Sequence, residues 1–95
     1  MPKLSEPEVE TRLAQLADWA RVGDQIVKRW RFSSAARALE FVNHAATLAQ
    51  GLNQAPEIIL SGRDVRVELA THAEGGLTDR DFELATALDR IPVER

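Results

Sequence analysis

Side chains that titrate near neutral pH are scarce in this sequence, whose two histidines are His44 and His72. His72 follows an apolar alternating stretch and precedes a Gly75-Gly76 pair, which predicts the end of a strand beside a loop. Side chains at such junctions often meet ligands, so His72 is a candidate for binding or acid–base chemistry. A purely structural role is the alternative. His44 falls at the edge of the polar arc of a predicted helix and is interpreted as a surface residue.

Asp81 is the second candidate, three residues after Thr78. This spacing is typical of a helix N-terminus, where the carboxylate caps the first turn and complements the helix dipole. The functional alternative is that Asp81 orients His72 or a ligand, because helix N-termini attract anions and polar ligand atoms.

Most other chemistry is not supported by the residue types. The chain has no cysteine, which excludes disulfides and thiolate metal sites. We find no nucleophile triad, phosphate-binding glycine loop or metal-ligand cluster, and we expect no metal. In the segment 52–57, Pro56 disfavours helix at Ala55 and therefore marks a helix stop. By the order of elements this loop could also lie near His72.

Length and composition predict one small domain, residues 1–95. The net charge of −3 argues weakly against nucleic-acid binding, which usually needs a basic face. No apolar run approaches the roughly 20 residues of a membrane span. The N-terminus is polar and acidic, unlike a signal peptide, so we expect a cytoplasmic protein without a membrane partner.

Three segments are predicted to be amphipathic helices from their apolar periodicity. The first covers residues 5–17, beginning with a Ser5–Glu8 capping-box spacing. The longest covers residues 34–52, and its apolar face spans close to half of the circumference. The last begins after Thr78 and ends at Pro92.

Four segments are predicted to be strands. Residues 25–32 alternate with one buried face, Lys28 excepted, and a short partner strand precedes them at residues 19–22. Residues 58–61 and 65–71 form a second pair around a Gly-Arg-Asp turn. The predicted class is α+β, in the order α-β-β-α-β-β-α, with three helices on one face of a four-stranded antiparallel sheet.

The apolar faces of these elements predict a single core. Its expected members are Val9, Leu13, Leu16, Leu39, Val42, Ala46, Val67, Leu69, Phe82, Leu84 and Leu88. The long helix has a wider apolar face than a small sheet needs, which favours contact with another helix or subunit.

Three stretches together resemble the pterin-4a-carbinolamine dehydratase family. Thr71-His72 followed by Gly76-Leu77-Thr78-Asp79-Arg80-Asp81 resembles its C-terminal signature, residues 26–32 its second strand, and residues 41–53 its long helix. The resemblance spans almost the whole chain. It implies the same sheet-and-helix fold, assembled as a dimer or tetramer.

The family's active-site motif is only partly present. It consists of an acidic or similar residue, three further residues, and then a His-His-Pro or His-Asn-Pro, with an aromatic residue about six positions later. The equivalent positions here hold Gln50, then Gln54, Ala55 and Pro56, then Gly62. The resemblance also places His72 at the family's third histidine and Asp81 at its motif aspartate.

The missing histidine pair bears directly on the reaction that the resemblance implies. Dehydrating a carbinolamine requires protonation of a leaving hydroxyl and removal of a ring N–H proton, and histidine does both near neutral pH. Gln54 can hydrogen-bond but cannot carry a proton, and Ala55 can do neither. Each lost acid or base typically costs ~10²–10⁴ in rate.

Two hypotheses follow from this resemblance. The first is a pterin dehydratase-like protein with a degenerate active site and no cofactor, acting as a protein-binding or assembly factor. Its most concrete version resembles the RuBisCO assembly factors of α-carboxysomes, with the RuBisCO large subunit as partner and a carboxysome-associated location. The second is a weak or altered 4a-hydroxytetrahydrobiopterin dehydratase that uses His72 and Asp81. In the first, a pocket at Gln54, Pro56, His72 and Asp81 could bind a pterin without turnover.

Overall fold

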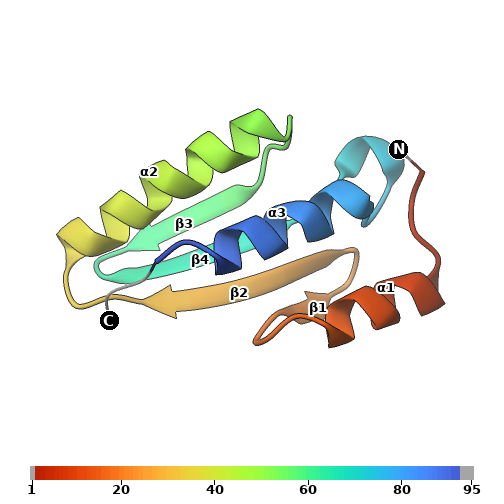
Figure 1. Cartoon of the computed structure of the whole chain (residues 1–95), viewed down its shortest axis with the longest axis horizontal. Helices are drawn as coiled ribbons and strands as arrows, with labels where there is room; N and C mark the ends of the chain where they lie inside the picture. Colours follow the sequence, from red (N-terminus) through yellow and green to blue (C-terminus); the bar gives the residue numbers. More distant parts are fainter. Residues whose placement is uncertain (1, 93–95) are drawn as a thin grey trace.

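The computed structural model describes residues 2–92 and contains one four-stranded antiparallel sheet. Its strands are β1 (Ala20–Val22), β2 (Gln25–Arg31), β3 (Glu57–Ser61) and β4 (Asp64–Leu69). They are ordered β1-β2-β4-β3 across the sheet, so the two hairpins are joined through β2 and β4 (Figure 1). The short β1 and β3 form the two edges.

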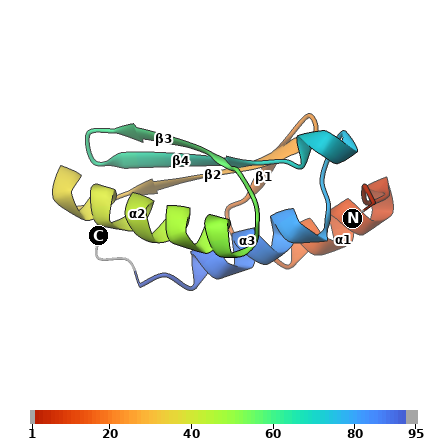
Figure 2. The same ribbon diagram turned by 90° about the horizontal axis from the view of Figure 1, so that it is seen from above.

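Three α-helices pack on one face of this sheet, as the sequence predicts (Figure 2). They are α1 (Glu6–Ala14), α2 (Ala35–Gly51) and α3 (Asp79–Asp89), and a 3₁₀ turn, η1 (His72–Glu74), lies between β4 and α3. The predicted α+β class and the order α-β-β-α-β-β-α are confirmed. No helix within residues 2–92 is long and apolar enough to cross a membrane.

The first helix begins where the sequence predicts but ends earlier than predicted. Ser5 and Glu8 form the capping box at its N-terminus, but the helix ends at Ala14 rather than at residue 17. Asp18 has a left-handed backbone, with φ of 66°, and turns the chain into β1. This turn lets Trp19 reach the core, where it is buried.

The helix-facing side of the sheet carries the central apolar side chains. Ile26 pairs with Leu69 and Trp30 with Val65 across β2 and β4, and all four are buried. The ring of Phe41 from α2 lies 4.7 Å from the Trp30 ring, centroid to centroid, and so fixes the helix on the sheet.

Lys28 lies on this same face, as the alternation of its strand predicts, but it is buried, whereas the sequence marked it as the exception to the buried face. Its Nζ is 2.7 Å from Oδ1 of Asp89 at the end of α3. The indole Nε1 of Trp19 donates to the same carboxylate, 3.0 Å from Oδ2. A buried charge is tolerated when it is paired and hydrogen-bonded, so Asp89 permits this lysine in the core.

The predicted core is correct except on the outer flank of α2. Six of its members are buried: Val9, Val67, Leu69, Phe82, Leu84 and Leu88. Leu13, Leu16 and Val42 are partly buried and pack against the core, whereas Leu39 and Ala46 are exposed. The helix packs through Ala38, Phe41, Ala45 and Ala49, and the sheet is too narrow to cover the rest of its apolar face.

Candidate functional site

A buried carboxylate with three hydrogen-bond donors marks the candidate site at the N-terminus of α3. Asp81 has no exposed surface. Its Oδ1 accepts from Nε2 of Gln54 at 2.8 Å. Its Oδ2 accepts from Oγ1 of Thr71 at 2.8 Å and from the backbone N–H of Thr78 at 2.9 Å. The cluster joins residues from three segments of the chain: the loop after α2, the end of the last strand segment, and the start of α3.

Asp81 is placed by the start of its helix. Thr78 is the N-cap residue and has an extended backbone, so its N–H would lack a helical partner without the carboxylate three residues later. The capping interpretation of Asp81 is thereby confirmed. The same carboxylate also holds Gln54 and Thr71, which no capping pattern predicts.

Gln54 reaches Asp81 because of the way α2 ends. Asn53 adopts a left-handed backbone with φ of 54°, and the N–H of Gln54 donates back to the carbonyl of Ala49 at 2.9 Å. This local geometry is a common helix C-terminus. It folds the chain back, so that the side chain of Gln54 is directed toward α3 rather than into solvent.

Thr71 was not singled out as a site residue from the sequence. It follows Val67 and Leu69 on the helix-facing side of the last strand segment, so the period-two alternation was the signal that could have found it. An isolated antiparallel β-bridge between Thr71 and Gly76 closes the loop after Thr71, with N···O distances of 3.0 and 3.3 Å. Its Oγ1 lies 2.9 Å from Oγ1 of Thr78.

Burial raises the pKa of the Asp81 carboxyl above its ordinary value, because the charged form loses its hydration. The hydrogen bonds from Thr78, Thr71 and Gln54, and the nearby His72, each oppose this shift. Desolvation is the largest effect. The site therefore holds a carboxyl group whose protonated form is favoured relative to an exposed aspartate.

His72 lies in η1 and is exposed. Among residues 2–92, no hydrogen bond joins it to Asp81, and its influence on that carboxyl is electrostatic only. It borders a hollow of about 210 Å³ together with Val22, Asp24, Gln25, Ala70, Gly75 and Gly76. Gly75 in this loop has a φ of 74°, a left-handed conformation that favours glycine.

Gln54 and Pro56 border a different hollow of about 290 Å³, at the end of α2. The other lining residues are Ala46, Ala49, Gln50, Asn53 and Ile58. Ala55 is exposed. His72 is thus not among the lining residues of the hollow that Gln54 borders, although both residues lie near Asp81.

The chemistry open to this cluster is hydrogen bonding around one buried acid. It contains an amide, two hydroxyls and a carboxyl, and its nearest imidazole faces outward. Within residues 2–92, no group of three or more histidine, aspartate or glutamate side chains is placed to hold a metal ion.

Comparison with known proteins assigns the chain to a family. The model of the pterin 4 alpha carbinolamine dehydratase family matches residues 2–91. The chain belongs to the pterin-4a-carbinolamine dehydratase family. This dehydratase assignment confirms the resemblance seen in the sequence.

Similar dehydratase-family sequences occur in bacteria and archaea. A Chloroflexus aurantiacus protein named "Putative pterin-4-alpha-carbinolamine dehydratase" is 43% identical over 91 residues, covering 96% of this chain and 98% of the relative. A Sulfolobus acidocaldarius protein of the same name is 33% identical, covering 94% and 98%.

Two solved structures share the dehydratase fold. The crystal structure of a transcriptional coactivator/pterin dehydratase from Brucella melitensis superposes with a TM-score of 0.87 at 31% identity, covering 92% of this chain and 95% of that one. A pterin dehydratase-like protein described as a RuBisCO assembly factor in the α-carboxysome gives a TM-score of 0.66 at 24% identity, covering 77% and 87%. The second likeness shows the fold only.

Proposed function

We propose that this family member is a pterin dehydratase-like protein that does not catalyse carbinolamine dehydration and acts by binding a protein partner. The observation that carries the proposal is the hydrogen bond from Gln54 to Asp81. An amide occupies the position where the family motif has a histidine, and it satisfies the carboxylate without supplying a transferable proton.

The outward position of His72 supports the same proposal. A dehydratase needs an acid for the leaving hydroxyl and a base for the ring proton, both within hydrogen-bond reach of one substrate. Here the remaining imidazole borders one hollow and Gln54 borders another. A pterin could still be bound without turnover, because only interactions that strengthen in the transition state accelerate the reaction.

The most concrete version of the proposed binding role is RuBisCO assembly in α-carboxysomes, with the RuBisCO large subunit as partner. The fold shared with the protein described as a RuBisCO assembly factor supports it at the level of architecture. In this version the protein works in the cytoplasm, in association with carboxysomes.

A dehydratase assay and a pull-down test the two parts separately. We expect turnover of 4a-hydroxytetrahydrobiopterin close to the uncatalysed rate, measured beside a family member that keeps both histidines. Turnover equal to that member would refute the non-catalytic proposal. Failure of the RuBisCO large subunit to bind in the pull-down would refute only the RuBisCO version.

The second candidate function is a weak or altered 4a-hydroxytetrahydrobiopterin dehydratase. It is favoured by the presence of His72 and Asp81 at family positions and by relatives named as dehydratases at 43% identity. On this hypothesis His72→Ala should remove whatever activity the protein has, while the exposed His44→Ala should leave it unchanged.

A further inference from the structure

Within residues 2–92, no helix covers the face of the sheet opposite α1, α2 and α3 (Figure 2). This open face carries a group of arginines from β2 and β4. Alternation along the strands directs Arg29 and Arg31 of β2 to this face, since Trp30 between them is buried beneath the helices. Arg66 of β4 lies on the same face, between the buried Val65 and Val67. Arg29 and Arg31 are exposed, and Arg66 is half-buried.

Arg29 and Arg66 are directly opposite each other in the register of β2 and β4. Like charges in directly opposed positions destabilise a sheet. Ile59 of β3 is the next residue in the same row, opposite Arg66 on its other side, and it is 43% exposed. The row therefore combines two cations and an exposed apolar side chain, and neither feature stabilises the isolated chain.

The neighbouring carboxylates neutralise only part of this charge. Nε of Arg31 lies 3.6 Å from Oδ1 of Asp64, an exposed pair. Nε of Arg66 lies 2.8 Å from Oε2 of Glu68, an ion pair that holds the guanidinium in place, although this buried Nε makes no hydrogen bond within the described part of the chain. No ion pair of Arg29 is found among residues 2–92.

These side chains surround a hollow of about 500 Å³ on the open face. Its charged lining consists of three arginines and one aspartate, with Ile59 and Ser61 along the β3 side. The planar guanidinium fork matches a carboxylate with two parallel hydrogen bonds. The hollow therefore suits a ligand that alternates carboxylates with apolar side chains.

We infer that this face, defined by Arg29, Arg66 and Ile59, is a docking surface for an extended acidic segment of a partner protein. The inference rests on the proposed role as a protein-binding scaffold and adds the chemistry of the partner. Carboxylates of the segment bind between Arg29 and Arg66, and an apolar side chain covers Ile59. The segment thereby adds negative charge beside Arg29, which has no ion pair in the described part of the chain, and beside the opposed Arg66.

The distribution of charge favours a short acidic segment over a nucleic acid. Glu57 and Glu68 form the next row of the same face, and the whole chain has a net charge of −3. A long polyanion laid across the sheet would meet these carboxylates, whereas a short segment can be confined to the arginine end. Nucleic-acid sites usually present a continuous basic surface.

Fluorescence anisotropy with a labelled peptide tests the docking surface on the full chain. The probe is an extended peptide of alternating glutamate and valine, and the comparison probe replaces each glutamate with lysine. We expect the glutamate peptide to bind and Arg29→Ser or Arg66→Ser to weaken its binding about tenfold each, since each change removes a charged donor to a carboxylate. Arg29→Lys should lose part of the affinity, because it keeps the charge but not the fork.

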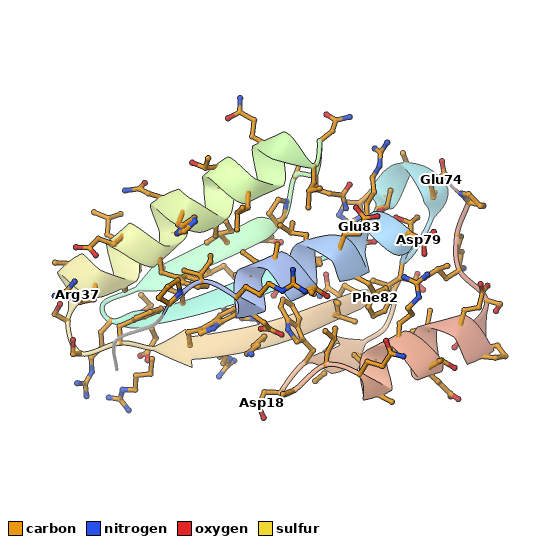
Figure 3. The ribbon with its side chains drawn as sticks, viewed as in Figure 1. Asp18, Arg37, Glu74, Asp79, Phe82 and Glu83 are labelled. Atoms are coloured by element: carbon orange, nitrogen blue, oxygen red, sulfur yellow. The ribbon has the colours of Figure 1, made fainter. Side chains whose placement is uncertain are left out.

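Arg37→Ser is the matched control, because it removes the same charge from outside the proposed surface. Arg37 lies at the start of α2, in the layer of helices and not on the open face of the sheet (Figure 3). It should leave peptide binding unchanged. Arg29→Ser also relieves the like-charge pair, so its melting temperature should not fall, and lost binding cannot then be ascribed to unfolding.

Three results would overturn the inference: equal binding of the lysine peptide, equal binding by the Arg29 and Arg37 variants, or tighter binding of a single-stranded oligonucleotide than of the glutamate peptide. The outcome is separable from the proposed function. Dehydratase turnover together with arginine-dependent peptide binding would reject the proposed function and keep the docking surface. If the protein shows no dehydratase turnover and does not bind the peptide, the docking surface is rejected and the non-catalytic proposal is kept.

Discussion

Gln54 and Asp81 are 27 residues apart in the chain and are joined by a 2.8 Å hydrogen bond from Nε2 to Oδ1. The bond connects the end of α2 to the first turn of α3, beneath the end of β4. It keeps the polar architecture of the site while leaving position 54 without a titrating group.

Restoring histidines at positions 54 and 55 should raise dehydratase activity. Each regained acid or base is worth about 10²–10⁴ in rate when the rest of the site is in place. We therefore expect Gln54→His with Ala55→His to exceed the unmodified protein by at least about tenfold in turnover of 4a-hydroxytetrahydrobiopterin. The control is Gln50→His, which adds an imidazole to the same hollow. Equal gains from both changes would contradict a specific role for position 54.

The contribution of Asp81 to stability should fall as pH rises. Its pKa is raised in the folded protein, so between the unfolded and folded pKa values the folded state binds more protons. Protonation therefore favours folding, and the stabilisation is lost as pH increases through the raised pKa. Asp81→Asn removes this dependence.

Denaturant melts of Asp81→Asn and the unmodified protein across pH measure this effect. The free energy of unfolding of the unmodified protein, minus that of the variant, should decrease with pH. Glu6 and Glu8 have lowered pKa values, through bonding to Arg21 and to Ser5 respectively, and they act in the opposite direction in both proteins. Subtraction cancels them, so a difference that stays flat with pH would contradict the assignment.

Two leucines on apolar faces should respond very differently to truncation. Leu69 is 1% exposed and Leu39 is 49% exposed. Leu69→Ala should reduce the free energy of unfolding by ~2–5 kcal/mol because it leaves a cavity in the core. Leu39→Ala should change it by less than about 0.5 kcal/mol. Urea melts at one protein concentration check both values. Equal reductions in the free energy of unfolding would show that the core face of α2 is wrongly assigned.

We expect the chain to form a homo-oligomer, a dimer or tetramer, at micromolar concentration. The exposed Leu39 on α2 and Leu60 on the edge strand β3 offer apolar surface beside an unpaired strand edge. Light scattering should give a molar mass of two or four times the 10.6 kDa of the monomer. Leu39→Glu should lower that mass, whereas Ala14→Glu at the exposed end of α1 should not. A monomer at all concentrations for the unmodified protein would refute the expectation.

The helices, the strands and their order can be predicted from local patterns in the sequence. Alternation in residues 25–32 and 65–71 marks strands, and the spacing of Ser5 with Glu8 and of Thr78 with Asp81 marks helix starts. These signals are local, because they depend on the backbone period and on unsatisfied N–H groups within one turn. The same local signals placed His72 beside a loop.

Which side chains of those elements meet depends on contacts that form only in the folded chain. Lys28 is buried because Asp89, 61 residues later, neutralises it, and Leu39 is exposed because the sheet beneath α2 is too narrow to cover it. Gln54, Thr71 and Asp81 likewise converge from three elements. Periodicity specifies which face of an element is apolar, but burial and polar pairing depend on the neighbours that fold against that face.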